Sequence, residues 1–208
     1  TSPEIDYKGK LQEYTQKKYL VTPIYKVLKE EENLWAEFYL GSSYTYQAVF
    51  QGFKKNYLET FKHGVKGGRI LQGIIEKDSI FYDAYLGTGT YQYFWARAAR
   101  YLPILKLVGG DANKAIRKLH TAAEKSIYSK LTSKNSLVFI YGEEKNYNKA
   151  DSIINSILLK YPGSRTLLWN KAELEFKKKN YLIAADLYTN LFSMYDTLNN
   201  KNYSNLAQ

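Results

Sequence analysis

The sequence predicts an all-α fold of about four stacked helix pairs, and three observations support this prediction. Apolar residues recur at the three- and four-residue spacing of a helix face, and sustained two-residue alternation is scarce. Turn residues such as Gly109-Gly110-Asp111 and Tyr161-Pro162-Gly163-Ser164 separate the helical segments. The apolar faces are too wide for either helix of a pair to bury alone, so the pairs must stack on one another.

The periodicity predicts about nine helices, with turn chemistry at their ends. Asp111 and Ser164 stand where an N-cap residue is expected, each just before a periodic segment. The predicted ranges are 6–30, 33–52, 56–77, 80–100, 111–127, 131–145, 147–160, 164–179 and 181–197.

A common arrangement of small and large residues recurs in the pairs. Each first helix carries a small or closely packing residue, at Gly41, Gly87, Val138 and Ala172. In each second helix a small residue is followed, four and seven positions later, by residues on the same stripe: Gly67, Leu71 and Ile74; Ala115, Leu119 and Ala122; Ala150, Ile154 and Ile157; Ala184, Tyr188 and Leu191. The small residue allows the paired helix to approach closely. On the same grounds we assign Gly64, Gly67 and Gly68 to helix packing.

These residues resemble the tetratricopeptide repeat, a helix–turn–helix unit of about 34 residues. The likeness is clearest at 131–197, where Leu137, Val138, Tyr141 and Pro162 fit the repeat, while Glu175 stands where an aromatic is usual. The resemblance implies one domain over 1–208, a right-handed α-α superhelix. Its parts are an N-terminal helix within 1–32, units at 34–79, 80–128, 129–162 and 163–197, and the start of a further unit at 198–208.

The first two units are longer than the repeat, and residues 83–93 also resemble a bacterial tetratricopeptide subfamily with extended units. The function of that subfamily is mostly unassigned. The chain begins with Thr1 and ends within an expected unit, so we expect a longer parent protein.

The resemblance also predicts a binding site, because first helices line the concave groove of such a stack. The groove-facing positions are mostly aromatic: Trp35, Phe38, Tyr46, Phe81, Tyr91, Gln92, Asn135, Phe139, Trp169, Phe176 and Lys177. An aromatic groove with a few polar anchors suits an extended peptide or a partner helix. For any one of these residues, packing between neighbouring units is an equal alternative.

Other chemistry has little support in the sequence. The chain has no Cys, so thiolate metal sites and a Cys nucleophile are excluded. Its two histidines, His63 and His120, lie in different units and have no cluster of further ligands. The glycines at 64–68 and 87–89 do not form a P-loop or a dinucleotide motif. We therefore expect a non-enzymatic protein-binding scaffold without a cofactor or a metal.

The net charge of +10 favours acidic partners and raises the question of nucleic acid. Most of the lysines stand near expected helix ends, where cations stabilise the helix dipole. The alternative function is RNA binding, because residues 6–31 resemble the start of a double-stranded RNA-binding domain and Lys54-Lys55 resembles its phosphate-binding pair. We consider nucleic acid the weaker alternative.

No apolar run approaches the length of about 18 residues that a membrane span needs. The compartment and the oligomeric state stay open. A periplasmic or cell-envelope location is favoured over a cytoplasmic one only by analogy with other bacterial repeat proteins.

Overall fold

The computed structural model describes residues 33–100 and 111–196. The chain divides into two compact units, residues 1–33 and residues 34–208, and all the helices described below belong to the second. The predicted helix at 6–30 and the predicted start of a further unit at 198–208 lie outside the described residues.

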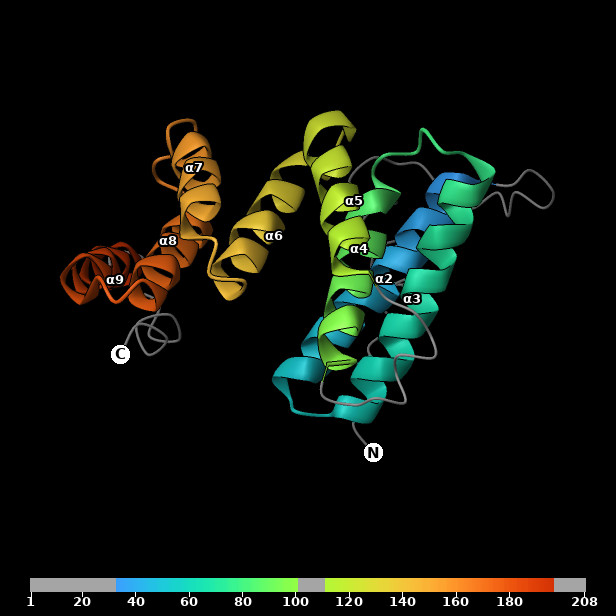
Figure 1. Ribbon diagram of the computed structural model, residues 1–208, viewed down its shortest axis with the longest axis horizontal. Helices are drawn as coiled ribbons and strands as arrows, with labels where there is room; N and C mark the ends of the chain where they lie inside the picture. Colours follow the sequence, from blue (N-terminus) through green and yellow to red (C-terminus); the bar gives the residue numbers. More distant parts are fainter. Residues whose placement is uncertain (1–32, 101–110, 197–208) are drawn as a thin grey trace, which may run out of the picture. The chain divides into compact units, whose positions relative to one another are not determined.

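The described residues form eight helices and no strand, which confirms the all-α prediction (Figure 1). The largest difference from the predicted ranges is the start of the helix predicted at 80–100, which begins at Ala84 because residues 79–83 form turns. There the Asp78 carboxylate accepts a hydrogen bond from Ile80 N (3.0 Å). The helices are α2 (Leu34–Phe53), α3 (Tyr57–Lys77), α4 (Ala84–Ala98), α5 (Ala112–Lys125), α6 (Lys130–Glu143), α7 (Tyr147–Leu158), α8 (Arg165–Lys177) and α9 (Tyr181–Asp196).

The helices associate as consecutive pairs, α2–α3, α4–α5, α6–α7 and α8–α9. Each pair contacts the next through its second helix, at α3–α4, α5–α6 and α7–α8. The first helices also contact one another in succession, α2 with α4, α4 with α6 and α6 with α8. The backbones of the second helices in the described part do not approach one another in this way, although Lys118 Nζ of α5 donates a hydrogen bond to Gln72 Oε1 of α3 at 2.8 Å. A surface that spans several pairs is therefore built mainly from first helices.

Small residues bring the paired helices together, as their spacing predicts. A Cβ atom added to Gly67 in α3 would lie 2.7 Å from the carbonyl oxygen of Gly41 in α2. A Cβ atom added to Gly89 in α4 would lie 3.0 Å from the carbonyl oxygen of Ala115 in α5. In both pairs the backbones approach too closely for a larger residue.

The prediction that Gly87 occupies this position in α4 is wrong. A Cβ atom on Gly87 would lie 2.2 Å from Leu71 of the preceding pair, so this glycine faces α3. Gly87 and Gly89 are two residues apart, and two residues turn a helix by about 200°, so they face opposite neighbours. When Gly89 is taken as the small residue of α4, the spacing between the small residues of the first and second helix is the same in both long pairs. It is 26 residues there, from Gly41 to Gly67 and from Gly89 to Ala115. In both short pairs it is 12 residues, from Val138 to Ala150 and from Ala172 to Ala184.

The first pair is longer than the third because both of its helices are extended where they join. Helices α2 and α3 have 20 and 21 residues, against 14 and 12 in α6 and α7. In this extension the two helices meet through small side chains and through the stacked rings of Tyr44 and His63, whose centroids are 5.8 Å apart. A Cβ atom on Gly64 would lie 3.8 Å from that of Ala48, and one on Gly52 would lie 3.7 Å from Thr60 Oγ1.

A Lys-Asn-Tyr sequence, which the sequence analysis did not use, recurs at three turns within pairs, beginning at Lys55, Lys145 and Lys179. These lysines have positive φ angles of 58°, 59° and 66°. The backbone N–H of the following asparagine donates to a carbonyl five residues earlier, at 2.9, 2.8 and 2.9 Å. This is the bond of a Schellman motif, which ends a helix and redirects the chain.

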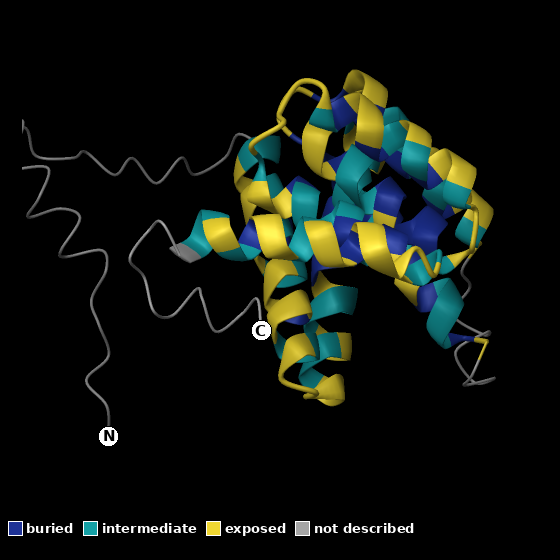
Figure 2. Cartoon of the chain, turned by 90° about the vertical axis from the view of Figure 1, so that its left-hand side faces the viewer, coloured by how far each residue is buried: buried dark blue, intermediate teal, exposed yellow. Residues whose placement is uncertain are grey.

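The core lies between first and second helices, where Figure 2 shows buried residues on the inward sides and exposed residues outside. Its larger cluster contains side chains from α4 to α8, including Tyr93, Leu119, Leu137 and Ile154. A smaller cluster is formed by Leu71, Ile74 and Ala84. The buried stripes of α3, α5 and α7 are those that the sequence predicted.

A buried carboxylate joins the second pair to the third. Asp83, the residue before α4, accepts a hydrogen bond at Oδ2 from Ile127 N (3.0 Å). Its Oδ1 accepts from Tyr128 N (2.9 Å) and from Ser129 N (2.7 Å). These N–H groups stand immediately before α6, so Asp83 supplies acceptors for the beginning of a helix in the next pair.

The two predicted N-caps differ. Asp111 caps α5, because its Oδ1 accepts from Asn113 N (2.8 Å) and Lys114 N (3.1 Å). Ser164 directly precedes α8, but its hydroxyl makes no capping hydrogen bond.

Candidate interaction surface

Two phenylalanines meet on successive first helices. Phe94 of α4 and Phe139 of α6 are 44% and 46% exposed, and their ring centroids are 6.0 Å apart. Lys177 of α8 places its Nζ 4.9 Å from the Phe139 ring centroid, within the range of a cation–π contact. Three consecutive first helices thus contribute to one aromatic surface.

An ion group crosses the same three helices. Glu143 of α6 pairs with Arg97 of α4, at 2.6 Å, and with Lys177 of α8. Burial opposes the charge of Glu143, but hydrogen bonds from Lys177 and Arg97 outweigh it and hold the pKa of this carboxyl below its usual value. The carboxylate therefore stays charged and neutralises part of the positive charge at this place.

Two further contacts fix the first helices to one another. Asn170 Nδ2 of α8 donates a hydrogen bond to Asn135 Oδ1 of α6 at 2.7 Å. Tyr93 of α4 donates its hydroxyl to Glu144, just after α6, at 2.8 Å. Burial and this hydrogen bond raise the pKa of Tyr93 to about 12, so its hydroxyl remains a donor at neutral pH.

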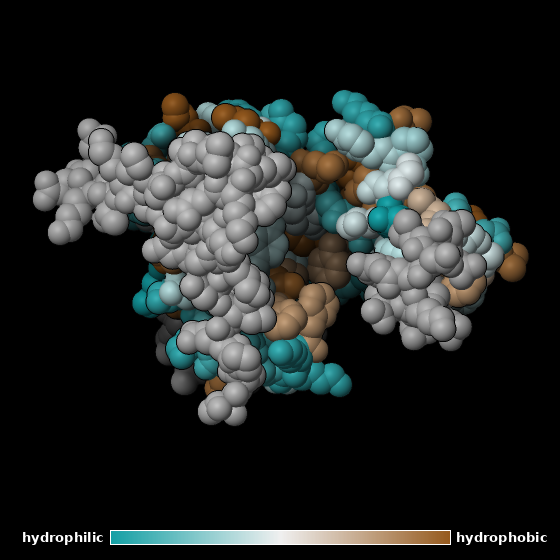
Figure 3. Space-filling model, turned by 180° about the vertical axis from the view of Figure 1, so that it is seen from behind, coloured by the Kyte–Doolittle hydropathy of each residue, from teal (hydrophilic) through white to brown (hydrophobic). Residues whose placement is uncertain are grey.

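We call this surface the first-helix strip. It consists of Phe94, Arg97, Asn135, Phe139, Glu143, Asn170 and Lys177. Figure 3, which views the molecule from behind relative to Figure 1, shows hydrophobic residues interspersed with hydrophilic ones wherever grey atoms do not cover the surface.

Of the predicted groove residues, the structure brings Asn135, Phe139 and Lys177 together in this strip. Trp169 and Phe176 also lie on α8, but they contact their own second helix. Trp169 is 5.5 Å from Tyr188, and Phe176 is 5.5 Å from Tyr181, measured between ring centroids. Although it contacts Tyr181, the Phe176 side chain is exposed to solvent.

Three other predicted residues form a separate aromatic cluster. The Trp35 ring lies 4.6 Å from Phe81, 5.6 Å from Phe38 and 5.5 Å from Tyr128, between centroids. Trp35, Phe38 and Phe81 are all half-buried, and the two phenylalanines pack against the smaller core cluster. Phe81 precedes α4 rather than lying on it. The structure therefore gives these residues packing contacts around the first pair.

The remaining predicted residues are also apart from the strip. Tyr46 is exposed on the extension of α2. Tyr91 packs toward α3, where its ring would lie 2.5 Å from a Cβ atom on Gly68, and its centroid is 5.7 Å from Trp95. Gln92 is half-buried on α4.

The sequence analysis missed Phe94, Arg97 and Glu143. Phe94 was missed because the small residue of α4 was placed at Gly87 instead of Gly89. The groove-facing position five residues after the small residue was therefore assigned to Gln92, whereas counting from Gly89 gives Phe94. The equal 26-residue spacing of the two long pairs could have revealed this register.

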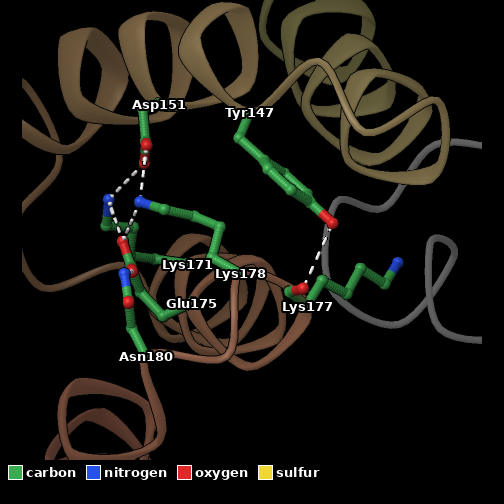
Figure 4. Close-up of polar contacts among 7 residues, drawn as sticks. All are labelled: Tyr147, Asp151, Lys171, Glu175, Lys177, Lys178 and Asn180. Carbon is green, nitrogen blue, oxygen red and sulfur yellow. Dashed lines mark hydrogen bonds and ion pairs between the residues drawn. The ribbon is translucent and has the colours of Figure 1, made fainter.

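A second ion group lies on the other side of α8, around Glu175 (Figure 4). This carboxylate is 3% exposed and contacts Lys171 at 2.8 Å and Lys178 at 3.1 Å. Asn180 Nδ2 donates to it at 2.7 Å. Both lysines also contact Asp151 of α7, at 2.7 and 2.6 Å. The group joins α7, α8 and the turn into α9.

The charge of Glu175 makes stability depend on pH. Burial alone would raise the pKa, but hydrogen bonds from Lys171, Asn180 and Lys178 lower it to about 2. A depressed carboxyl pKa adds stability above the unfolded-state pKa, and this stability is lost as the pH falls toward the folded value. We expect the free energy of unfolding of the wild type to fall by about 2 kcal/mol more than that of Glu175→Gln between about pH 5 and pH 2.

Urea denaturation at several pH values measures this difference. The exposed Glu124 provides the control, because Glu124→Gln should follow the wild-type curve. Parallel curves for the wild type and Glu175→Gln would contradict the role assigned to this ion group.

The described residues contain no cluster of three His, Cys, Asp or Glu side chains that could hold a metal ion. His63 contacts Glu59 at 3.2 Å and His120 contacts the Tyr141 hydroxyl at 2.7 Å, in different pairs. The glycines at 64–68 and 87–89 lie inside α3 and α4.

The segment 6–31, which resembles an RNA-binding domain, lies outside the described residues. Lys54 and Lys55 lie at the turn of the helical hairpin between α2 and α3. A shallow apolar depression lined by Asn155, Leu158, Leu159 and Pro162 lies at the end of α7 and contains no predicted site residue. None of the helices in the described ranges combines the length and the apolar character required to cross a bilayer.

Comparisons with protein-family models, curated proteins and solved structures found no match. What this chain binds must therefore be inferred from its own residues.

Proposed function

We propose that this chain is a non-enzymatic interaction scaffold of the tetratricopeptide type, which holds an extended peptide segment of a partner protein along the first-helix strip. The succession of contacts between first helices supports the proposal, because these helices approach one another closely from each pair to the next. The spacing of 34 residues from Val138 to Ala172 also equals the length of one such repeat. A right-handed superhelix is the arrangement that this repeat type adopts.

The observation that carries the proposal is the partly exposed Phe94–Phe139 pair beside the ion group of Arg97, Glu143 and Lys177. Aromatic side chains supply large contact areas at interfaces, and charged groups at the rim give orientation. Because the two cations share a single carboxylate, the strip retains positive charge. Together with the net charge of +10, this favours a peptide that carries acidic residues next to an apolar anchor.

Selection from a displayed library of random peptides tests the proposal without a known partner. We expect peptides recovered on the wild type to bind Phe94→Ala/Phe139→Ala at least about tenfold more weakly, because the variant removes both rings of the strip. Fluorescence anisotropy of a labelled recovered peptide measures the affinities.

The matched control is Leu159→Ala/Tyr161→Ala, which removes comparable exposed apolar surface from the turn between α7 and α8. This control should keep wild-type affinity. Equal affinity of the strip variant and the wild type, or an equal loss in the control, would refute the assignment of the strip.

A further inference from the structure

The joined ends of α2 and α3 carry large apolar side chains that face solvent. Phe53 is 82% exposed and Leu58 is 84% exposed, and Phe50 and Tyr57 are exposed as well. We call these four residues and the turn between the helices the hairpin tip. Exposed apolar side chains gathered in this way on a folded surface usually mark a place of interaction.

Packing within the hairpin does not explain these residues. The two helices meet through Ala48, Gly52, Thr60 and Gly64, all of them small. The helices that carry the tip are longer than those of the third pair. The corresponding turn between α8 and α9 exposes only Tyr181 and Leu182, at the positions of Tyr57 and Leu58, and has no counterpart of Phe53 because Lys177 stands there. Figure 2 shows this hairpin with mostly exposed residues at its end.

The charges around the tip are mainly positive. The stretch from Phe50 to Leu58 contains Lys54 and Lys55 and no acidic residue. The Lys54 Nζ atom lies 4.4 Å from the Phe50 ring centroid, so the cation stands directly beside the apolar surface. The nearest carboxylate in sequence, that of Glu59, is already paired with Lys62 at 3.5 Å and with His63 at 3.2 Å.

We propose that the hairpin tip inserts its apolar side chains into the headgroup region of an anionic lipid bilayer. Aromatic residues bordered by lysines are the side chains that anchor proteins at this interface. The lysines complement the negative surface of such a membrane. The apolar residues enter the boundary between headgroups and acyl chains while the cations contact the phosphates.

Two features favour a lipid surface over other occupants. The tip is the end of two helices joined by a short turn, and such an end offers no groove in which a peptide could lie. A symmetric contact between two copies of the tip would bring the Lys54 and Lys55 side chains of both copies together, and like charges oppose each other across an interface. The membrane contact uses none of the residues of the first-helix strip, so a bound partner peptide and a membrane can be held at the same time.

Flotation of the full chain with lipid vesicles tests the inference. We expect the wild type to bind phosphatidylcholine vesicles that contain about 30% phosphatidylserine, to bind pure phosphatidylcholine vesicles more weakly, and to be released by salt. Phe53→Ser/Leu58→Ser should lower the bound fraction at least about tenfold at equal lipid, because it removes the most exposed apolar groups. Lys54→Gln/Lys55→Asn should weaken binding and reduce its dependence on salt, since asparagine tolerates the left-handed conformation of Lys55.

The matched control is Leu159→Ser/Ile127→Ser, which removes two apolar side chains that are 86% and 74% exposed at other places. It should bind vesicles as the wild type does, and circular dichroism should show that all variants are folded. The inference is overturned if the wild type does not bind anionic vesicles, or if the tip variant binds as well as the control. It is also overturned if the tip variant only abolishes self-association, seen by analytical ultracentrifugation, or only abolishes peptide binding.

Discussion

Replacing Gly67 by alanine is expected to lower the free energy of unfolding by about 3 kcal/mol. The new methyl group would lie 2.7 Å from the backbone oxygen of Gly41 and 2.8 Å from the Thr45 methyl group. A backbone atom cannot turn away as a flexible side chain can, so α2 and α3 must separate. That separation loosens the contact that unites the first pair.

The control lies six residues further along the same helix. A Cβ atom on Gly73 would meet nothing within 4 Å, so Gly73→Ala should raise the free energy of unfolding by up to about 1 kcal/mol through helix propensity alone. Urea denaturation of the two variants measures the contrast. A Gly67→Ala protein as stable as Gly73→Ala would contradict the close approach of α2 and α3.

Replacing Asp83 by alanine is expected to cost about 3 kcal/mol of folding free energy. The change leaves the N–H groups of Ile127, Tyr128 and Ser129 without their carboxylate acceptor, in a place where Asp83 and Ser129 are buried. Water cannot replace the acceptor fully there. The effect should extend to α6, because these N–H groups precede its first turn.

Asp111 provides the comparison, because it caps α5 from an exposed position with two backbone bonds. Asp111→Ala should cost much less folding free energy than Asp83→Ala, since water can solvate the freed N–H groups. Thermal denaturation followed by circular dichroism ranks the two variants. Equal losses would show that the Asp83 carboxylate does not join the second pair to the third.

Helix positions were predictable from the sequence because their signals are local. The apolar stripe at Ala150, Ile154 and Ile157 requires only a regular helix to face one direction, and all three are buried. The N-cap at Asp111 depends on its own side chain and the next few N–H groups. Such features do not depend on where the neighbouring pairs lie.

The candidate site was predictable only in part, because exposure depends on neighbours that the sequence does not display. Trp35 and Phe139 look alike as aromatic residues of first helices. The former is surrounded by Phe38, Phe81 and Tyr128, whereas the latter stays 46% exposed. Likewise, Gly87 and Gly89 differ only in which helix they face, and that difference moved the predicted surface by two residues.

Glu175 shows the same limit for charge. The resemblance alone predicted an aromatic residue where Glu175 stands. The structure places this buried carboxylate among Lys171 and Lys178, which in turn pair with Asp151 of the preceding helix pair. The sequence does not display the contact with Asp151, so it could not predict that the charge of Glu175 is neutralised.

The most direct test of the proposed binding surface is site-specific photo-crosslinking. The photoreactive p-benzoylphenylalanine would replace Phe139 on the strip in one protein and the exposed Leu159 in another, each irradiated with a peptide recovered by library selection. We expect a covalent adduct at position 139 that excess unlabelled peptide suppresses, and none at position 159. An adduct at 159 with none at 139 would contradict the proposal that the first helices hold the partner.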